Sequence, residues 1–443
     1  MTLLPAGWTD DAAVLATHRL DRSGFDPGGR PRAVAFAESV DDVAEVLRAA
    51  NADGIPVVVR GAGTGLSGGA VATEGSVVLD LSRMDRILEL SAADELAVVE
   101  PGVVTARLDR AAGKHGLRYA PDPASAAIST IGGNIATNAG GLRCAKYGVT
   151  RDSVLGLDII LADGRRISTG RRTVKGVAGY DLTGLFVGSE GTLGVIVGAT
   201  LRLRPDPVRT ATLSAFFADF AAAAAAAAAI TAARLQPAVA ELLDTACLDA
   251  IDAADGSALR SRGAAFLLVQ TDGWGADAEM EAVRGVVGPH ATVLDVTTDP
   301  AEAETLLATR RSALPALERR GRVLIEDVAV PRSRLAEAVA AIEEIAERSG
   351  TRIATMAHAG DGNLHPILVL DRGHEIDEHV WATAGEVFTT ALRLGGTLTG
   401  EHGVGLLKRR WLADELGPDV VALQHDLKAV LDPRSILNPG KKL

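Results

Sequence analysis

Short apolar segments and amphipathic segments alternate after Arg32, a pattern that predicts strands and helices in turn. The segment A-V-A-F at 33–36 has the composition of a strand. S-V-D-D then opens a helix in which Ser39 is the cap and Asp42 completes a capping box. The apolar residues of that helix recur at helical spacing and mark its buried face: Val43, Leu47 and Ala50.

The same patterns extend along the rest of the first half of the chain. Residues 1–33 predict a short helix and then a loop, because acidic residues precede A-A-V-L-A-T-H and glycine and proline accumulate after it. The further elements predicted here are strands at 55–60, 76–82 and 96–100, a helix at 105–115, and a hairpin at 155–169 that turns at Asp163 and Gly164.

Pro205 and Pro207 interrupt the pattern and mark a domain boundary. Beyond them strands and helices alternate as far as R-I-A-T-M-A-H at 352–358, which predicts an α+β sheet covered by helices. The alanine tract Ala221–Ala229 predicts a tightly packed helix rather than a membrane span, because alanine is a strong helix former but only weakly hydrophobic. Three more helices are predicted at 381–394, 408–416 and 420–431.

Length and composition set the class of protein. With 443 residues the chain exceeds a single core, so two domains are expected. The net charge of −12, without long basic runs, argues against nucleic acid as a partner. The two cysteines, Cys144 and Cys247, indicate neither a disulfide framework nor a thiolate metal site. Neither a signal peptide nor a transmembrane segment is recognised, so a cytoplasmic protein acting on small molecules or proteins is expected.

The strand at 55–60 ends in a glycine loop, G-A-G-T-G-L-S-G-G-A, which spans Gly61 to Ala70. Gly63, Gly65 and Gly68 match the Rossmann fingerprint, but that fold requires a helix immediately after the loop. A strand follows here instead, so a Rossmann site is rejected. Successive exposed amides bind phosphate without any helix, and an anion nest is the remaining interpretation.

Two further segments are rich in glycine: Pro121–Gly148, with I-G-G-N-I-A-T-N-A-G-G, and Gly179–Ile196, with G-S-E-G-T-L-G-V-I. Paired glycines, small residues and few charges suit a backbone that approaches a large flat ligand closely. A single glycine pair would be explained by a tight turn between buried strands. Three such segments in one domain indicate a cofactor.

Histidines and carboxylates gather in two short glycine-flanked segments, H-A-G-D-G-N-L-H from His358 to His365 and G-E-H-G around Glu401 and His402. Neutral imidazole and carboxylate are the usual ligands of zinc and similar metals, and they also perform acid and base chemistry. The alternative is a Gly-Asp-Gly turn between strands whose histidines hydrogen-bond locally. The repetition of this chemistry in two segments favours a metal or catalytic site.

At these segments the chain resembles the FAD-binding oxidoreductases of the vanillyl-alcohol oxidase and p-cresol methylhydroxylase (PCMH) superfamily. R-G-A-G-T-G-L-S-G-G, P-D-P, G-G-N-I-A-T-N-A-G-G and G-S-E-G-T-L-G-V-I are similar to the branch that contains the FAD subunit of glycolate oxidase, D-lactate dehydrogenase and D-2-hydroxyglutarate dehydrogenase. The resemblance implies an α+β fold in three parts. These are a two-subdomain PCMH-type FAD-binding domain with a helical lead-in at 1–206, an α+β (ferredoxin-like) cap domain for the substrate at 207–400, and C-terminal helices at 401–443 that return to the FAD-binding domain.

The resemblance also implies which residues bind FAD. The diphosphate would be wrapped by Arg60, Gly61, Ala62, Gly63, Thr64, Gly65, Leu66 and Ser67. The ribityl chain and isoalloxazine would be lined by Pro121, Asp122, Ser125, Thr130, Gly132, Gly133, Asn138, Gly141 and Tyr147, while Glu190, Gly191 and Ile196 would lie toward the adenine. Because the glycine loop has neither histidine nor cysteine for a covalent tether, non-covalent FAD is expected.

By the same resemblance, His358, His365 and Glu401 are the ligands of a divalent metal. Zinc is the first expectation, with manganese or iron as alternatives. Three protein ligands leave a coordination position open for substrate. His402 is then the candidate general base, since imidazole transfers protons near neutral pH, and Asn363 would hydrogen-bond the substrate.

Arg310, in L-A-T-R-R-S-A-L, falls where the family places an arginine that binds the substrate carboxylate, with Arg311 as the second candidate. A solvated helix face is the alternative for both arginines. The D-2-hydroxyglutarate branch has a lysine near the segment I-E-D-V-A-V-P, where Ile325 and Glu326 stand in this chain. That departure favours a monocarboxylate such as glycolate, D-lactate or a larger apolar 2-hydroxy acid.

The expected activity is therefore FAD-dependent, metal-assisted oxidation of a D-2-hydroxy acid to the 2-oxo acid. D-2-hydroxyglutarate dehydrogenation, a non-catalytic FAD subunit that passes electrons within a larger complex, and metal-dependent hydrolysis are the alternatives. The electron acceptor is left open among a quinone, a cytochrome, an electron-transfer flavoprotein and another subunit. A homodimer and a peripheral position at the inner membrane face are also left open.

Overall fold

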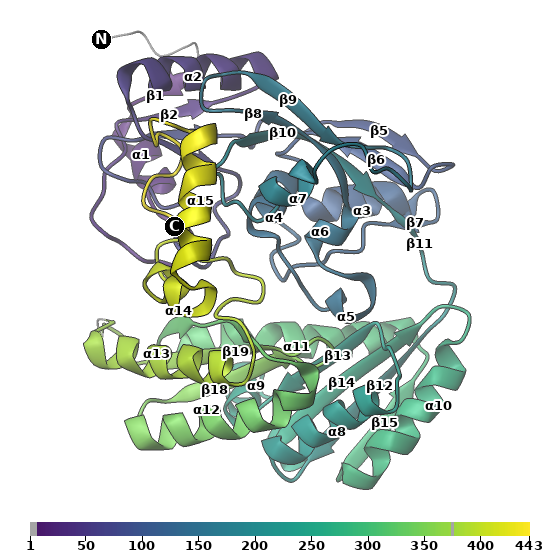
Figure 1. Ribbon diagram of the computed structural model, residues 1–443. Coiled ribbons are helices and arrows are strands. Elements are labelled where there is room, and N and C mark those ends of the chain that lie inside the picture. Colours follow the sequence, from purple (N-terminus) through teal and green to yellow (C-terminus); the bar gives the residue numbers. More distant parts are fainter. Residues whose placement is uncertain (1–6, 374–375) are drawn as a thin grey trace. The chain divides into compact units, whose positions relative to one another are not determined.

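The computed structural model describes residues 7–373 and 376–443, which form two compact units (Figure 1). Unit 1 contains the residues up to Gly140, Gly148–Asp206 and Glu401–Leu443, and unit 2 contains Gly141–Tyr147 and Pro207–Gly400. The expectations for residues 1–6 lie outside the described residues.

The first part of unit 1 is a small sheet with a parallel core. Its strands β1 (Trp8–Thr9), β2 (Ala33–Phe36), β3 (Val57–Arg60) and β4 (Val77–Asp80) lie in the order β1-β2-β4-β3. The helices here are α1 (Ala12–His18) and α2 (Val40–Asp53). The predicted capping box of Ser39 and Asp42 is confirmed, as is the buried face of α2. Because β4 rather than a helix follows the glycine loop, the rejection of a Rossmann site is also confirmed.

The second part of unit 1 is an antiparallel sheet with its own apolar core. Its strands β5 (Ile87–Ser91), β6 (Leu96–Val99), β8 (Val154–Ile160), β9 (Arg166–Gly170) and β10 (Val195–Arg202) lie in the order β5-β6-β10-β8-β9. A separate pair is formed by β7 (Leu117–Arg118) and β11 (Arg204–Pro205). The helices of this part are α3 (Thr105–Gly113), α4 (Ile131–Thr137), α6 (Thr150–Ser153) and α7 (Leu182–Phe186). The two apolar cores match the two-subdomain architecture predicted from the resemblance.

The C-terminal residues of unit 1 are held by the first sheet. They form a 3-10 turn (Arg409–Trp411), α14 (Leu412–Leu416) and α15 (Pro418–Leu431). Leu437 then bridges to Val57 in β3, and the Asn438 amide donates to the Val57 carbonyl. Lys441 is 2% exposed. A frayed tail, which the sequence left open for Asn438–Lys441, is therefore excluded.

Unit 2 is built on one antiparallel eight-stranded sheet. Its strands are β12 (Thr210–Phe217), β13 (Val239–Leu243), β14 (Ala265–Asp272), β15 (Val293–Thr297), β16 (Arg322–Ile325), β17 (Val328–Ala329), β18 (Ile353–His358) and β19 (Asn363–Leu370). The main path runs β15-β12-β14-β13-β18-β19-β16, and β17 also pairs with β19. The helices are α5 (Cys144–Tyr147), α8 (Phe220–Ala232), α9 (Thr245–Asp255), α10 (Ala276–Val287), α11 (Pro300–Arg320), α12 (Leu335–Ser349) and α13 (Glu378–Arg393).

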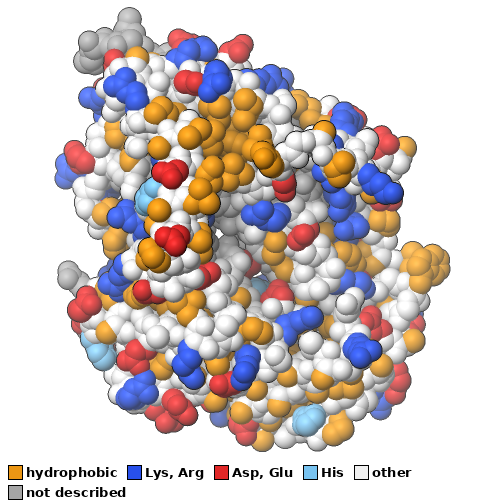
Figure 2. Space-filling model, viewed as in Figure 1, with side chains coloured by type: hydrophobic (Ala, Val, Ile, Leu, Met, Phe, Trp, Pro, Cys, Tyr) orange, Lys and Arg blue, Asp and Glu red, His pale blue; other side chains and the backbone are white. Residues whose placement is uncertain are grey.

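Helices cover both faces of this sheet (Figure 1). Helices α9 and α11 share one apolar core with β13, β18 and β19. Helices α8, α10 and α12 lie against the opposite face, and the alanines of α8 that turn inward are fully buried, as predicted. On the face of the molecule shown in Figure 2, acidic and basic side chains are interspersed. None of the helices in the described residues is long and apolar enough to cross a bilayer.

Three local expectations differ from the structure. No helix was expected in the segment Pro121–Gly148, which contains α4 and α5. The strand expected in R-V-L-I-E-D-V-A-V is interrupted, so that β16 and β17 flank Glu326 and Asp327. The predicted pattern contains no counterpart of β13, β15 and α9, and β13 is a short, wholly buried strand that shows no alternation.

Candidate functional site

The glycine loop of unit 1 presents a row of available backbone donors. Within the described residues, no amide from Gly61 to Gly69 donates a hydrogen bond to another group of the protein. Buried or half-buried N–H groups are normally paired, so a row of them without acceptors fits a bound anion. This observation supports the predicted binding of a diphosphate at Arg60–Ser67.

Residues near the N-terminus form hydrogen bonds that support the glycine loop. The Arg60 guanidinium donates to the Leu20 carbonyl at 2.9 Å, and a Cβ at Gly63 would lie 2.1 Å from that guanidinium. Asp21 accepts the Ala70 amide at 3.1 Å. Burial raises the pKa of the Asp21 carboxyl and lowers that of the Arg60 guanidinium. Arg60 therefore supports the loop from a buried position, and Gly63 has a left-handed backbone (φ 69°) that favours glycine.

Helix α4 lies beside the start of the loop. Thr130 caps the helix by accepting the Gly133 amide, and a Cβ at Gly61 would lie 2.3 Å from Thr130 Oγ1. Gly132 packs against Pro101, since a Cβ there would lie 2.6 Å from the proline side chain. Asn138 ends the helix with a left-handed backbone, and its Oδ1 accepts the Arg151 amide at 2.9 Å. Gly132 and Asn138 thus have roles in packing and capping in addition to any contact with a flavin.

Glu190 joins the C-terminal segment to the rest of unit 1. Its carboxylate accepts the amides of Val404 (2.9 Å) and Gly405 (2.7 Å), and its carbonyl accepts the Asn438 side-chain amide. A Cβ at Gly191 would lie 3.0 Å from the Asn438 side chain, and Ile196 is buried in β10. The Lys441 amine lies in the same region, where burial lowers its pKa to about 7. These contacts give Glu190 a structural role that sequence reasoning missed.

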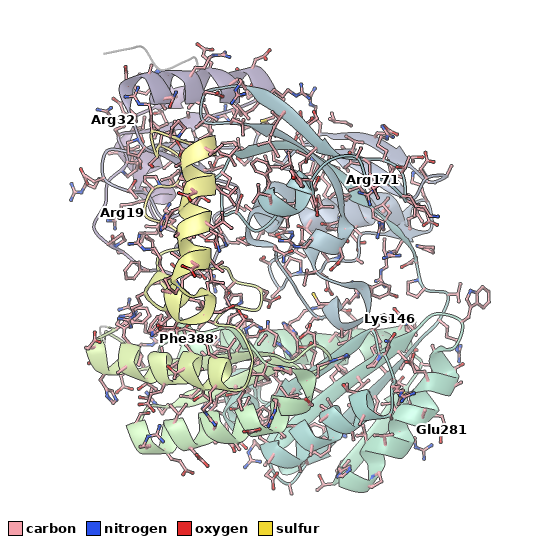
Figure 3. All side chains as sticks on the ribbon, in the orientation of Figure 1. Arg19, Arg32, Lys146, Arg171, Glu281 and Phe388 are labelled. Atoms are coloured by element: carbon pink, nitrogen blue, oxygen red, sulfur yellow. The ribbon has the colours of Figure 1, made fainter. Side chains whose placement is uncertain are left out.

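The short segment Gly141–Tyr147 belongs to unit 2 rather than unit 1. Its Lys146, labelled in Figure 3, forms an ion pair with Asp272, and the Tyr147 hydroxyl donates to the same carboxylate at 2.6 Å. Pro121, Asp122 and Ser125, by contrast, precede α4 in unit 1. The residues predicted to line the isoalloxazine therefore belong to different units.

His358 and His365 of unit 2 lie on a β-hairpin. His358 ends β18 and His365 lies in β19, with the Gly-Asp-Gly turn between them, so the local backbone is the predicted turn. Cross-strand pairs link His358 with Asn363 and Met356 with His365. Opposed residues and residues two apart share a face of a sheet, so all four side chains lie on one face. The two imidazoles lie 5.0 Å apart between ring centroids and nearly at right angles.

His358 has a partner outside its own hairpin. His358 is paired in register with Glu241 on β13, and its Nδ1 lies 2.6 Å from Glu241 Oε1. The other carboxylate oxygen accepts the Arg310 Nε–H at 2.7 Å. Glu241 is 0% exposed, Arg310 7% and His358 6%. A buried chain of arginine, carboxylate and imidazole is thus built on one face of the sheet.

A second carboxylate lies beside His365. Asp327 Oδ1 is 3.7 Å from His365 Nδ1, and Asp327 also accepts the Thr399 hydroxyl at 2.8 Å. Asn363 Oδ1 is buried and accepts no hydrogen bond within the part of the chain that the structure describes. A Cβ at Gly400 would lie 2.3 Å from this oxygen, so the chain that leads to Glu401 passes directly beside Asn363. Two buried imidazoles and an available amide oxygen fit a divalent cation and its ligands.

Glu401 and His402 open the last segment of unit 1. The His402 Nε2 and Glu401 Oε1 atoms lie 3.9 Å apart, and both side chains are largely buried. Ser67 in the glycine loop donates its hydroxyl to the carbonyls of His402 (3.2 Å) and Gly403 (2.8 Å). The two residues therefore follow a backbone that the glycine loop fixes, while their predicted roles as ligand and base depend on their side chains.

The two candidate arginines differ sharply in environment. Arg311 lies on the solvated side of α11, where it pairs with Glu304 and its side chain is 44% exposed. Arg310 turns to the buried side and holds Glu241. The solvated alternative therefore describes Arg311 but not Arg310. Ile325 and Glu326, at the end of β16, are half-buried and buried respectively.

Replacing Arg310 with alanine is expected to lower the free energy of unfolding by about 3–5 kcal/mol, because Glu241 would remain as a buried charge without its cation. Arg311→Ala is the matched control, and its exposed pair should contribute at most about 1 kcal/mol. Urea unfolding of the two variants and the wild type measures the difference. Equal, small losses for both would show that the Arg310–Glu241 pair is not buried in solution.

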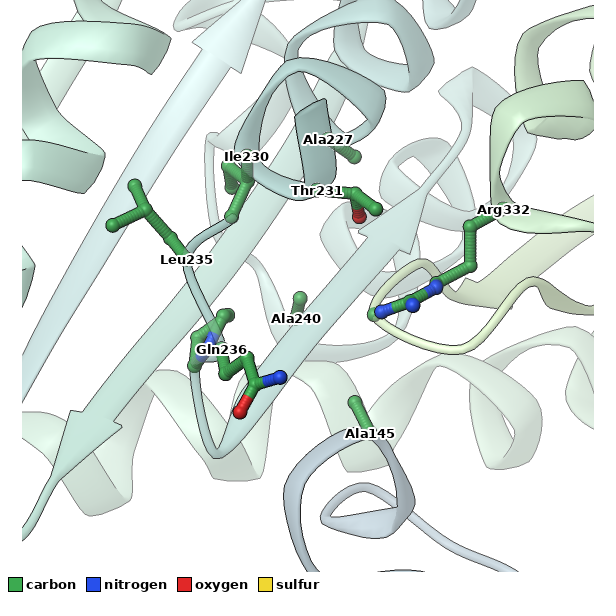
Figure 4. A pocket seen from close by; sticks show the side chains of 10 residues that line it. Ala145, Ala227, Ile230, Thr231, Leu235, Gln236, Ala240 and Arg332 are labelled. Carbon is green, nitrogen blue, oxygen red and sulfur yellow. The ribbon is translucent and has the colours of Figure 1, made fainter. Parts of the chain in front are cut away.

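A small hollow in unit 2 is unrelated to these groups. Figure 4 shows it at the end of α8, where Ala145, Gln236 and Arg332 are among the side chains that line it. Its free volume is about 10 Å³, roughly the room for one water molecule. It is therefore too small for a substrate.

Two family models and several known proteins match this chain. Residues 31–170 match the family model described as FAD binding domain, and residues 206–442 match FAD linked oxidases, C-terminal domain. The chain is 44% identical to glycolate oxidase subunit GlcD of Bacillus subtilis over 93% of this chain and 88% of that protein. It is 37% identical to D-lactate dehydrogenase of Archaeoglobus fulgidus over 90% of this chain and 89% of that protein.

The fold also matches solved structures at low sequence identity. A structure of p-cresol methylhydroxylase with substrate bound has a TM-score of 0.80 at 18% identity, covering 98% of this chain and 93% of that one. Alkyldihydroxyacetonephosphate synthase has a TM-score of 0.75 at 19% identity, covering 99% and 83%. The fold predicted from the resemblance is thereby confirmed. The chain belongs to the FAD-linked oxidases and is an FAD-linked oxidoreductase close to glycolate oxidase subunit GlcD and D-lactate dehydrogenase.

Proposed function

We propose that this protein oxidises a D-2-hydroxy acid to the 2-oxo acid with the help of a divalent metal. The observation that carries the proposal is the buried pair of His358 and His365 on one sheet face, in a chain that belongs to the FAD-linked oxidases. An oxidase that only passes electrons needs no such pair, because a metal is useful where a hydroxyl must be activated. Residues 1–206 are proposed to bind FAD, residues 207–400 to bind the substrate, and residues 401–443 to pack back on the FAD-binding domain.

Each named side chain has one task in this proposal. His358, His365 and Glu401 would hold the metal, which would polarise the substrate hydroxyl and lower its pKa. Non-covalent FAD would supply the hydride acceptor at flavin N5. His402 accepts the hydroxyl proton, and Asn363 hydrogen-bonds the substrate through its available Oδ1. Zinc is the preferred metal, because nitrogen and carboxylate ligands suit it, with manganese and iron as alternatives.

Substrate selection is proposed to rest on one carboxylate. Arg310 Nε is engaged by Glu241, so the substrate carboxylate would be bound by the terminal nitrogens of the same guanidinium. Ile325 and Glu326 offer no cation for a second carboxylate. Glycolate, D-lactate or a larger apolar monocarboxylate is therefore preferred over D-2-hydroxyglutarate.

The proposal is tested by mixing the FAD-loaded protein anaerobically with 2-hydroxy acids of both chiralities and following the flavin absorbance. Glycolate or a D-monocarboxylate is expected to bleach the flavin, with L-acids and D-2-hydroxyglutarate much slower. If D-2-hydroxyglutarate alone bleached the flavin, D-2-hydroxyglutarate rather than a monocarboxylate would be the substrate. A flavin that no 2-hydroxy acid reduces, but that exchanges electrons with a partner protein, would identify an electron-transfer subunit instead.

Electron transfer from the reduced flavin completes the proposed cycle. The acceptor is a quinone, a cytochrome, an electron-transfer flavoprotein or another subunit, and one relative in the comparison is itself named as a subunit. We propose a cytoplasmic protein, either free or peripheral at the inner membrane face. A homodimer is compatible with the proposal, and sedimentation of the purified protein measures it.

A further inference from the structure

Glu241 occupies a position that neither the sequence motifs nor the proposed chemistry uses. It lies in the middle of β13, and the sheet register places it directly opposite His358. One carboxylate oxygen meets His358 Nδ1 at 2.6 Å, and the other accepts the Arg310 Nε–H at 2.7 Å. The side chain is 0% exposed. Each oxygen of this buried carboxylate thus has one partner.

The protonation pattern of His358 follows from this arrangement. A carboxylate paired with a guanidinium offers only acceptor atoms, so the proton between Glu241 and His358 must reside on the imidazole Nδ1. The lone pair of the ring is then on Nε2, which is the atom that would bind a metal. A carboxylate behind a ligating imidazole also fixes the ring orientation and strengthens its donation to the metal.

We infer that Glu241 is a positioning residue that holds His358 in the tautomer and orientation required for metal binding, with Arg310 holding Glu241 in turn. The inference rests on the proposed metal at His358. It adds two residues, 117 and 48 positions before His358 in the sequence, to those on which metal affinity depends. Neither would touch the metal.

Glu241→Gln tests the inference, because glutamine keeps the shape of the side chain but replaces one carboxylate oxygen with an NH₂ group. Its single carbonyl oxygen can accept from either His358 or Arg310, and its NH₂ group then faces the other donor. Glu241→Asp keeps the charge but withdraws the carboxylate by one methylene. Asp244→Asn is the matched control, because Asp244 is a half-buried acid just beyond β13 that accepts the amides of Cys247 and Thr355.

The measurement is the affinity of the metal-stripped, FAD-loaded protein for Zn²⁺, from competition with a chromophoric chelator, together with thermal unfolding. Glu241→Gln is expected to weaken Zn²⁺ binding by about 10–100-fold. Asp244→Asn should lower the unfolding temperature but leave the affinity unchanged. The ¹⁵N shifts of His358 in the metal-free protein should report protonated Nδ1 in the wild type and a changed pattern in Glu241→Gln.

The outcomes separate the inference from the proposed function. A wild type that binds no Zn²⁺, Mn²⁺ or Fe²⁺ contradicts the proposed metal and the inference together. A wild type that binds metal while folded Glu241→Gln binds it equally well overturns the inference alone. If Glu241→Gln does not fold, Glu241→Asp decides in its place: an affinity between those of wild type and His358→Ala supports the inference, and an unchanged affinity overturns it.

Discussion

Replacing His402 with alanine is expected to slow flavin reduction by the 2-hydroxy acid by about 10²–10⁴-fold, the usual loss on removing a general base. FAD should remain bound, because the contacts of this residue with the glycine loop are made by its backbone. The Ser67 hydroxyl donates to the carbonyls of His402 and Gly403, and alanine retains both acceptors. The reduction rate is measured by anaerobic stopped-flow absorbance, and the FAD content by the visible spectrum.

His425→Ala is a suitable control for this variant, since His425 is an exposed histidine on α15 in the same unit. It should reduce its flavin at the wild-type rate. A His402→Ala protein that did the same would remove His402 from the mechanism. Loss of FAD from His402→Ala would instead indicate that the side chain supports the cofactor loop.

Removing the metal is the second change with a large expected effect. Without a cation at His358 and His365, the substrate hydroxyl keeps the high pKa of an alcohol, and its proton is harder for His402 to remove. The loss of several kcal/mol of stabilisation corresponds to a rate at least about a hundredfold lower. Metal content is followed by elemental analysis and flavin reduction by absorbance. Adding back zinc, manganese and iron separately should restore the rate with the native metal.

Features formed by residues that are close together in the chain could be predicted from the sequence. His358, Asn363 and His365 lie on one hairpin, and the alternation of a strand brings them to one face. The capping box of Ser39 and Asp42 and the strand after the glycine loop are equally local. The composition of the glycine loop leaves an anion nest as one interpretation, and the loop's amides within the described residues have no protein acceptor.

Contacts between distant segments could not be predicted in this way. Glu241 meets His358 only through the register of β13 and β18, and β13 is a short, wholly buried strand without alternation. The pairing of Arg310 with Glu241 depends on which side of α11 faces the sheet, which two adjacent arginines do not reveal. Helix α4 forms despite two glycines, because Thr130 caps it and Pro101 packs against it. Each of these contacts can be recognised only in the tertiary structure.

The central claim is that a metal-activated hydroxy acid reduces the flavin of this protein. Its most direct test is a single anaerobic absorbance trace of the FAD-loaded protein mixed with glycolate or D-lactate, recorded before metal removal, after it and after reconstitution. The account predicts rapid bleaching before metal removal and bleaching at least about a hundredfold slower after it. Reconstitution with the metal should restore rapid bleaching. Bleaching that is equally fast in the rigorously metal-free protein would contradict it.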